Sequence, residues 1–429
     1  MKPRHHFKKL TLRRDLSLFQ AIACGVGIIV GAGIYVLLGP AAGMAGNAVW
    51  ISFIISAFLA LLTGFSYAEL SSLYPKDGSE YVYLENTFNK KLAFLIAYTI
   101  ILGSSISAAA VSLGFAGYFG ALFNLNNFVL IGALIIILMT LVNLLGVRDS
   151  SYLNILLISV EIIGLIFIIL ISLKYFGSVN YFEAPKSLPG IFSAASLIFF
   201  AYIGFESLVK LSEETKNAKK IIPLALISSI FIATLLYILV SLSAVSVLGY
   251  KALSESKAPL VDVASKAVGS DISLVISIIA LLSTSTTVLL ILLSSSRMLY
   301  GLGKEIKQLR IFTKVSENAR VPYLSLLTIV VLSLLFIMIG KIETVASITN
   351  FTIYLTFLFV NLSLLILRYK KPNLKRKFRA PFNIGKFSVT AFLGIFSSLF
   401  FILNLQLKVI LGGIVLTFLG LFIGRLIKK

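Results

Sequence analysis

The stretch GVGIIVGAG at residues 25–33 decides the interpretation of this chain. It lies inside an apolar run from Leu16 to Met44 and places four glycines within nine residues. A secretory signal peptide has an apolar centre of about 7 to 15 residues, so this longer run is expected to remain as a membrane span. Glycines grouped in a span either allow neighbouring helices to approach closely or mark a place where the helix unwinds.

A second stretch, FFAYIGFE at residues 199–206, also places a glycine at membrane depth, and an acid follows closely. Counting apolar runs puts 25–33 in the first span and 199–206 in the sixth. Transporters built from two five-helix inverted repeats have interrupted helices at the first position of each repeat. We therefore predict an interruption in both spans. The alternative for the first stretch is that its glycines only form packing faces at helical spacing.

The composition excludes a soluble fold. Of 429 residues, 58% are hydrophobic and 13% charged, and the mean hydropathy is +1.00. Soluble domains have about 45–50% apolar and about 25% charged residues, and a helix needs about 20 apolar residues to cross a bilayer. We predict an all-α membrane protein with twelve transmembrane helices, at residues 18–40, 48–72, 92–122, 128–146, 153–174, 190–209, 221–248, 272–299, 322–340, 345–367, 387–405 and 408–425.

The basic residues predict the orientation. Lys and Arg number 38 against 17 Asp and Glu, a net charge of +21. With the N-terminus in the cytoplasm, most of these basic residues fall in cytoplasmic loops, as is typical of helical membrane proteins. Those assigned to the outer side are Lys174, Lys186, Lys251, Lys257, Lys266, Lys341 and Lys408. Topology and attraction to anionic lipid of the inner leaflet therefore explain the charge, and a nucleic-acid partner is not expected.

No connection between the spans is long enough for a soluble domain. The chain is predicted to form one transporter domain at residues 16–425, between cytoplasmic tails at 1–15 and 426–429. This domain divides into repeat one, repeat two and two C-terminal helices, at about residues 16–174, 190–367 and 387–425. The segment Tyr300–Arg320 is predicted either as a short helix on the inner surface or as a plain loop.

Cysteine and histidine are too few for metal or disulfide chemistry. Cys24 is the single cysteine, which excludes an intrachain disulfide and a thiolate cluster. Its position in the first span argues against a disulfide-linked subunit. The only two histidines, His5 and His6, lie near the start of the chain, so histidine-ligated metals and histidine proton relays are not expected in the membrane. We predict neither a metal nor a cofactor.

An interrupted span has its own binding chemistry. The free N-terminal end of a half-helix presents unpaired N–H groups and the positive end of a dipole, which suit a carboxylate. Carbonyls released nearby suit an ammonium group or a sodium ion. A zwitterion matches this pair of ends.

Two acids lie deep inside the predicted spans, Glu161 in the fifth and Glu206 in the sixth. Intramembrane acids are functional by default, and the structural alternative is a protonated acid that is hydrogen-bonded between helices. Glu69, at the inner end of the second span, is predicted to pair with a basic residue at the interface. The eighth span carries a hydroxyl run that either bonds its own backbone or forms a cation or coupling site with the first and fifth spans: Ser283, Thr284, Ser285, Thr286 and Thr287.

Four segments resemble the amino acid, polyamine and organocation transporters, a superfamily that includes prokaryotic amino acid permeases. They are residues 25–39 (GVGIIVGAGIYVLLG), 67–83 (YAELSSLYPKDGSEYVY), 199–223 (FFAYIGFESLVKLSEETKNAKKIIP) and 296–302 (SRMLYGL). The resemblance extends over nearly the whole chain, and the first and third segments are specific in combination. It implies the sodium-symporter fold, a 5+5 inverted repeat that is followed here by two further helices.

The resemblance also implies site residues. Backbone atoms of the first span would bind the carboxylate and amino groups of the substrate, at Ile29, Val30, Gly31, Ala32 and Gly33. The sixth span would line the same pocket with Ala201, Tyr202, Ile203 and Gly204. Phe200 would form an aromatic gate over the substrate, and Glu206 matches an acid implicated in proton sensing in some members.

The sequence departs from the family pattern at Glu161, where several proton-coupled relatives have a lysine. A carboxylate there could accept a proton or help to hold a cation, which leaves the coupling ion open. A common Asp-Gly pair after Tyr300 is also missing, and Lys304, Glu305 and Ile306 take its place. This second departure concerns gating rather than class.

The leading functional interpretation is a secondary transporter of the plasma membrane that carries an amino acid inward by alternating access, coupled to protons. The alternatives are an amino acid or polyamine exchanger of the same fold and a sodium-coupled symporter. An enzyme is not expected, because the spans contain no histidine and no cluster of acids. A channel is disfavoured, because paired interruptions favour an occluded site over an open pore. The sequence leaves the particular amino acid open.

Overall fold

A computed structural model describes residues 17–74, 80–145, 151–213, 215–316 and 321–426. Within these residues nearly the whole chain is helical, as the long apolar runs predict. The N-terminal tail at 1–15 and the last three residues of the C-terminal tail lie outside the described residues.

The first part of the chain supplies the elements around the first predicted interruption. They are α1 (Leu18–Ile29), α2 (Ala32–Ala45), η1 (Gly46–Ala48), α3 (Val49–Leu73), α4 (Glu80–Thr87), α5 (Lys90–Phe123), α6 (Phe128–Leu144), α7 (Ser151–Ser172) and η2 (Leu173–Tyr175), where η marks a 3-10 helix.

The second part begins with the other interrupted span. Its elements are α8 (Ser187–Ile198), η3 (Phe199–Tyr202), η4 (Phe205–Glu213), α9 (Ala218–Glu255), α10 (Pro259–Val268), η5 (Ser270–Ile272), α11 (Ser273–Glu305), η6 (Lys307–Thr313), α12 (Tyr323–Ile337), α13 (Ile342–Lys370), β1 (Asn383–Ile384), β2 (Phe387–Ser388), α14 (Val389–Leu403) and α15 (Leu407–Leu426).

Eight segments of the described chain are long and apolar enough to cross a membrane: Ala32–Leu73, Lys90–Phe123, Leu156–Tyr175, Ser187–Val209, Ala218–Glu255, Ser270–Glu305, Ile342–Lys370 and Leu407–Leu426. Four further apolar helices, α1, α6, α12 and α14, have only 12 to 17 residues. A helix of 15 residues is about 23 Å long, which is shorter than a hydrocarbon core of about 30 Å. The predicted multi-pass helical class is confirmed at this coarser level.

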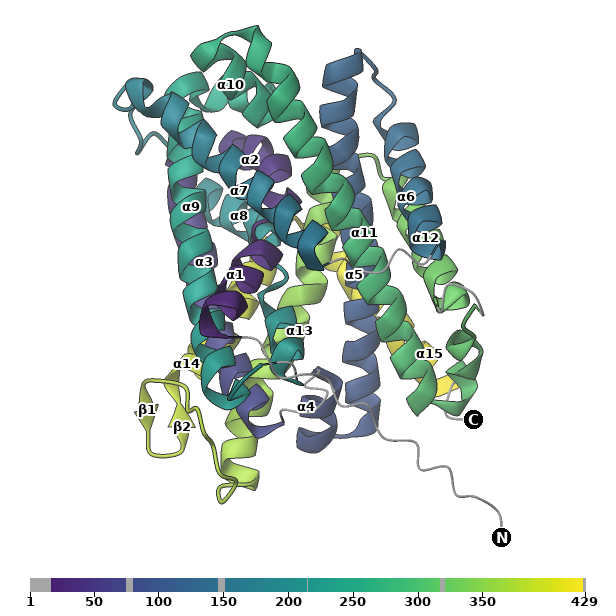
Figure 1. Cartoon of the computed structure of the whole chain (residues 1–429). Helices are drawn as coiled ribbons and strands as arrows, with labels where there is room; N and C mark the ends of the chain where they lie inside the picture. Colours follow the sequence, from purple (N-terminus) through teal and green to yellow (C-terminus); the bar gives the residue numbers. More distant parts are fainter. Residues whose placement is uncertain (1–16, 75–79, 146–150, 214, 317–320, 427–429) are drawn as a thin grey trace.

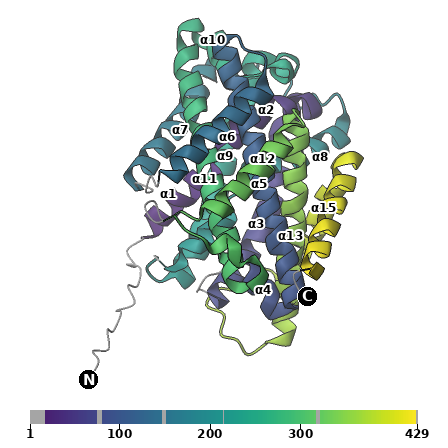
Figure 2. The ribbon, with the colours of Figure 1, turned by 90° about the vertical axis from the view of Figure 1, so that its right-hand side faces the viewer.

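Two long helices organise the packing. Helix α9 contacts α1, α2 and α3, and α5 contacts α6, α11, α12 and α13. Figure 1 shows α3 and α9 on one side of the molecule and α6 and α12 on the other, with α1 between them. The view in Figure 2 shows α15 along one edge, beside α13. The two interrupted spans thus lie against α9 rather than at the rim.

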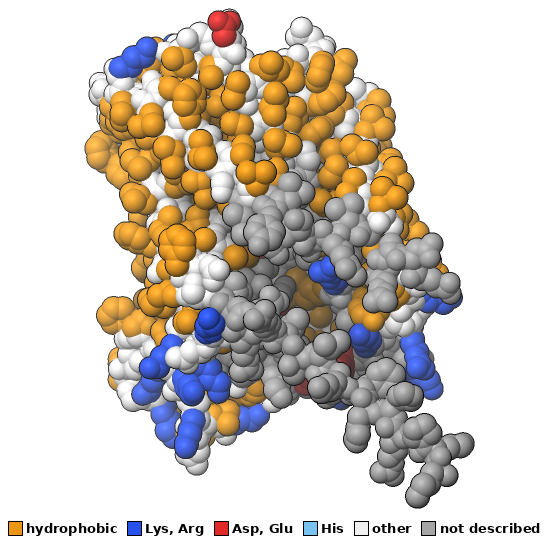
Figure 3. Space-filling view, in the orientation of Figure 1, with side chains coloured by type: hydrophobic (Ala, Val, Ile, Leu, Met, Phe, Trp, Pro, Cys, Tyr) orange, Lys and Arg blue, Asp and Glu red, His pale blue; other side chains and the backbone are white. Residues whose placement is uncertain are grey.

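The surface is divided by chemistry along the long direction of the molecule. In Figure 3, hydrophobic side chains cover the upper and middle parts of the visible face, and Lys and Arg gather at its lower end. The same end holds α4 and the β1–β2 hairpin in Figure 1. An apolar band of this kind is what a wall in contact with lipid requires.

Glu69 in α3 is a fully buried acid with two arginine partners. Arg368 of α13 donates to both carboxylate oxygens, at 3.0 Å from Nε and 2.5 Å from Nη2. Arg376 Nε adds a bond of 3.0 Å, and the backbone N–H of Ala380 adds one of 2.7 Å. Such saturation is what a carboxylate away from water needs. The predicted pairing with a basic residue is confirmed, although the pair is buried rather than interfacial.

Several elements were not anticipated from the sequence. These are α4, α10, the two-stranded hairpin, and a bend in α9 where Gly249 has φ +72°. The segment Tyr300–Arg320 follows the short-helix alternative, since α11 continues to Glu305 and η6 comes after it. Arg320 itself lies outside the described residues.

Candidate functional site

The first predicted span is interrupted at Val30 and Gly31. Helix α1 ends at Ile29, and α2 begins at Ala32. Val30 has φ −76° and ψ 89°, and Gly31 has φ −133° and ψ −156°, so neither residue is helical. The flanking residues Ile29 and Ala32 are buried. The predicted interruption of this span is present.

The sixth predicted span is interrupted at Ile203 and Gly204, between η3 and η4. Gly204 has φ +121°, a conformation that side chains with a Cβ rarely adopt. A Cβ at this position would also lie 3.0 Å from the carbonyl oxygen of Ile28. Glycine is therefore required at 204 for its conformation and for its contact with α1.

The two interruptions touch each other through backbone atoms. Gly204 lies against Ile28, and a Cβ added to Gly33 would come within 2.5 Å of the Ala201 Cα. Gly25 and Gly27 instead face Ser229 of α9 and Ile158 of α7, respectively. The packing alternative therefore holds for Gly25 and Gly27, and the helix unwinds at Val30 and Gly31.

Tyr237 of α9 joins the two interruptions, and sequence reasoning missed it. Its buried hydroxyl lies 2.8 Å from the Ile29 carbonyl oxygen and 2.9 Å from that of Ala201. In an unbroken α-helix these carbonyls would accept bonds from the amides of residues four positions later. A phenolic hydroxyl has one hydrogen to donate, and here two acceptors share it. The available signal was a tyrosine in an apolar span, because a buried hydroxyl usually has a partner.

Glu206 completes the second interruption. Its Oε2 accepts a hydrogen bond of 2.9 Å from the Gly204 N–H. A continuing 3-10 helix would direct that N–H to the Ala201 carbonyl, three residues earlier. The Glu206 carboxylate thus accepts from the Gly204 N–H, and the Tyr237 hydroxyl donates to the Ala201 carbonyl. This geometry assigns Glu206 a role in stabilising the broken backbone, whatever its part in proton movement.

Glu161 of α7 is buried, with 7% of its surface exposed, and it contacts the eighth predicted span. Ser283 of α11 donates a hydrogen bond to Glu161 Oε1. The other four hydroxyls of the run bond carbonyls of their own helix, among them Thr284 to the Ala280 carbonyl at 2.7 Å and Ser285 to the Leu281 carbonyl. The structure therefore brings Ser283 to Glu161, while Thr284 and Ser285 follow the alternative of backbone bonding.

A short series of contacts links this acid to the first interruption. Thr287 donates to the Ser283 carbonyl at 2.8 Å, and its Oγ1 lies 3.4 Å from where a Cβ of Gly31 would be. Tyr35 of α2 donates to the backbone carbonyl of Glu161 at 3.2 Å. The acid and the first interruption are therefore joined by contacts through α2 and α11.

The remaining predicted residues surround the second interruption. Phe200, Ala201 and Tyr202 are buried in η3. The Tyr202 hydroxyl donates to the Phe53 carbonyl of α3 at 3.1 Å, and its ring packs edge to face on Tyr237. The polar end of Tyr202 is thus directed to α3, which leaves its backbone as the part that borders the interruption.

Two interrupted helices in contact, in a chain with many membrane-length apolar segments, define the class of protein as a multi-pass transporter. Comparison with known families makes this specific. The pattern of the amino acid permease family matches residues 16–418. The chain belongs to this family, within the amino acid, polyamine and organocation superfamily, and the predicted resemblance is confirmed.

Relatives of known name are similar over most of this chain. It is 30% identical to the branched-chain amino acid permease BcaP of Bacillus subtilis, over 96% of this chain and 92% of that protein. It is 32% identical to the methylthioribose transporter of Bacillus subtilis, over 87% of this chain and 86% of that protein. It is 29% identical to the mouse cationic amino acid transporter 4, over 84% of this chain and 61% of that protein. The chain is accordingly a transporter and not an enzyme.

Proposed function

We propose that this permease is a secondary active transporter that carries an amino acid across the plasma membrane by alternating access and proton symport. One observation carries the proposal: the carbonyls of Ile29 and Ala201, from two different interruptions, converge on the Tyr237 hydroxyl. Carbonyls released from helical bonding suit an ammonium group, and the start of α2 offers N–H groups to a carboxylate.

The proposed architecture has twelve crossings with both termini in the cytoplasm. Residues 16–174 and 190–367 would form two inverted repeats, each with its interruption in the first crossing, and 387–425 would add two helices. The contact between the interruptions supports this arrangement, since inverted-repeat transporters bind substrate where their broken helices meet. The four short apolar helices would cross with help from neighbouring helices and interfacial side chains.

The substrate would bind through backbone groups of two segments, Ile29–Gly33 and Phe200–Gly204. Substrate atoms would replace part of the bonding that Tyr237 supplies to the carbonyls. The coupling proton would bind at Glu161, whose buried carboxyl accepts a bond from Ser283. Glu206 is the second candidate, because its carboxylate holds the Gly204 amide and so ties proton binding to the broken backbone.

Uptake into proteoliposomes tests the function. An acidic exterior should drive accumulation of at least one labelled amino acid, and a competition panel should include branched-chain and cationic amino acids, polyamines and methylthioribose. Glu161→Gln should abolish the response to the pH gradient while exchange of labelled for unlabelled substrate continues. Uptake equal to that of empty liposomes for every compound would disprove the proposal.

Exchange is the second candidate, and Glu161 is the observation that favours it. The resemblance to the family implies a lysine at this position in several proton-coupled members, and this chain has a glutamate instead. An exchanger would show stimulation by internal substrate and no response to an imposed proton gradient. Sodium coupling would instead appear as uptake that requires a sodium gradient at constant pH.

A further inference from the structure

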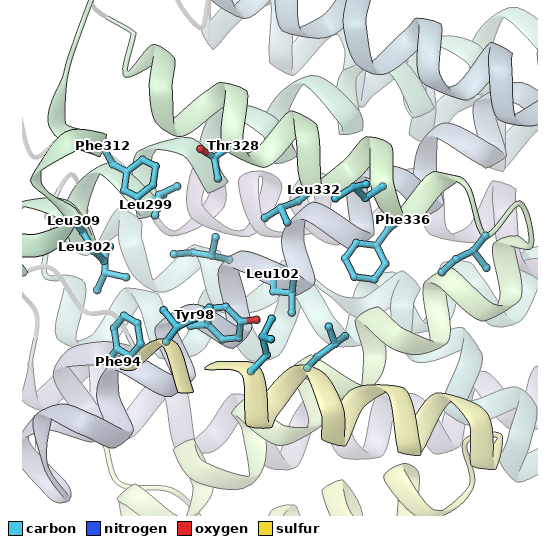
Figure 4. A pocket seen from close by; sticks show the side chains of 16 residues that line it. Phe94, Tyr98, Leu102, Leu299, Leu302, Leu309, Phe312, Thr328, Leu332 and Phe336 are labelled. Atoms are coloured by element: carbon cyan, nitrogen blue, oxygen red, sulfur yellow. The ribbon is translucent and has the colours of Figure 1, made fainter. Parts of the chain in front are cut away.

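A second region of the protein has the features of a binding site. A cavity of about 590 Å³ runs between α5, α11, η6, α12 and α15, away from the interrupted helices. Figure 4 shows side chains from these elements pointing into it. Its lining is aliphatic and aromatic except for the hydroxyls of Tyr98 and Thr328, and Thr328 bonds the Leu324 carbonyl at 2.8 Å. We refer to this cavity as the α12–α15 groove.

The groove exists because α12 and α15 both pack on α5 and leave space between them. Leu335 and Leu419 line it and are 63% and 50% exposed, so it opens to the outside of the helix bundle. Water does not fill a cavity with so few polar partners. An apolar ligand from the membrane is the occupant that such a lining favours.

One end of the groove is basic. Helix η6 contributes Leu309 and Phe312 to the lining, and its Lys307 and Arg310 are exposed. Helix α15 reaches the same end, since Gly424 lies against Phe94 and the exposed Arg425 follows it. Glu305 is an exposed acid in this neighbourhood and offsets part of the charge. The charges lie where a lipid headgroup would project from a chain in the groove.

From this arrangement we propose that the α12–α15 groove binds one acyl chain of an anionic phospholipid, whose headgroup contacts Lys307, Arg310 and Arg425. The site is separate from the substrate site and does not depend on which substrate is carried. Its ligand belongs to the leaflet at the basic end of the molecule.

The combination of an apolar lining and a basic end favours a lipid chain as the occupant. The lining residues of α12, from Thr328 to Phe336, extend over about 12 Å at helical rise. A cavity of about 590 Å³ lies within the range of about 300–1,000 Å³ that is typical of sites for small ligands.

Native mass spectrometry of the purified full chain tests the proposal, with phosphatidylglycerol and phosphatidylcholine of identical acyl chains as probes. The parent protein should retain one phosphatidylglycerol at concentrations where phosphatidylcholine is lost. The double variant K307Q/R310Q should weaken retention about fivefold per charge, the factor that corresponds to about 1 kcal/mol for each basic residue near an anionic surface. The control K408Q, at the other end of α15, should behave as the parent.

A second variant, L332W/L419W, fills the groove and should lose phosphatidylglycerol, whereas L411W, on an exposed part of α15 outside the groove, should retain it. Equal retention of the two lipids by the parent would overturn the proposal. Unchanged retention of phosphatidylglycerol by L332W/L419W would also overturn it. If this variant keeps the lipid but changes from dimer to monomer, the groove would be assigned to a second copy of the chain instead. If L332W/L419W does not fold, unchanged affinity in K307Q/R310Q alone would overturn it.

Discussion

Gly204 has both a positive φ and a close backbone contact, and each of these disfavours a side chain at this position. Its φ is +121°, and the Ile28 carbonyl oxygen lies 3.0 Å from where a Cβ would be, so a methyl group there would be crowded. Each effect alone destabilises a protein by about 1–3 kcal/mol. The interruption of the sixth span therefore depends on this residue more than on any side chain nearby.

Gly204→Ala should lower the thermal unfolding temperature in detergent and abolish uptake. The expected loss is about 2–5 kcal/mol, from strain and overpacking together. Gly301→Ala in α11 is the matched control, because no atom lies within 4 Å of its Cβ position and it has no positive φ. Equal behaviour of the two variants would contradict the requirement for glycine at 204.

Tyr237→Phe should leave the protein folded and strengthen substrate binding. Removal of the hydroxyl leaves two buried carbonyls without this donor, and an unsatisfied buried group costs about 1–3 kcal/mol, which an ammonium group of the substrate would recover. The KM for substrate should therefore fall while the expression level stays near that of the parent. Tyr369→Phe, with 57% of the residue exposed, controls for loss of a tyrosine hydroxyl. An unchanged KM would remove Tyr237 from the site.

At the scale of elements, Glu69 shows how one acid connects three parts of the chain. It lies on α3, and its partners lie on α13 and on the segment between α13 and the hairpin. Asn361 of α13 adds bonds of 2.6 Å with Ser66 and 3.0 Å with Thr63 on the same face of α3. The α3–α13 contact is thus a row of buried polar pairs.

Glu69→Gln should destabilise the protein strongly, because Arg368 would stay buried without its counter-charge. Breaking a buried pair costs about 3–5 kcal/mol. Glu85→Gln is the control, since the Glu85–Lys90 pair is exposed and 3.7 Å apart, and such pairs contribute about 0–1 kcal/mol. Thermal unfolding of both variants in one detergent gives the comparison. A similar small shift for both would show that α13 does not rely on Glu69.

These elements also show what a sequence can and cannot predict. The glycines of 25–33 and 199–206 predicted the two interruptions only together with their positions in the first and sixth spans, because glycines alone also suit close packing of helices. Which hydroxyl meets Glu161 was not predictable, since neighbouring residues on a helix point about 100° apart and the rotation of α11 is set by packing. Tyr237 was missed for the same reason, because its two acceptors come from distant segments that only the fold brings together.

At the scale of the whole molecule, the distribution of basic residues predicts which end faces the cytoplasm. Lys and Arg gather at the end that holds α4 and the hairpin. Lys371 lies near this end, after α13, and Lys408 lies at the start of α15. The two positions should therefore be on opposite sides of the membrane.

Labelling with a membrane-impermeant thiol reagent tests this orientation in intact cells. In a Cys24→Ala background, Lys408→Cys should react from outside, and Lys371→Cys should react only after the cells are permeabilised. Lys408 is exposed and Lys371 is partly exposed, so access depends on the side of the membrane. The reverse pattern would place the basic end outside and invert the proposed topology.

The Tyr237 hydroxyl has a consequence for cargo selection. With one hydrogen between the Ile29 and Ala201 oxygens, the place where the two interruptions meet is short of one donor. A protonated amine brings three hydrogens on one positively charged nitrogen and makes good the shortage, whereas each hydroxyl of a sugar brings one hydrogen and no positive charge. Discrimination between these cargoes would then arise from the hydrogens that each cargo can donate to main-chain carbonyls. The shape of the side chains around the site would matter less.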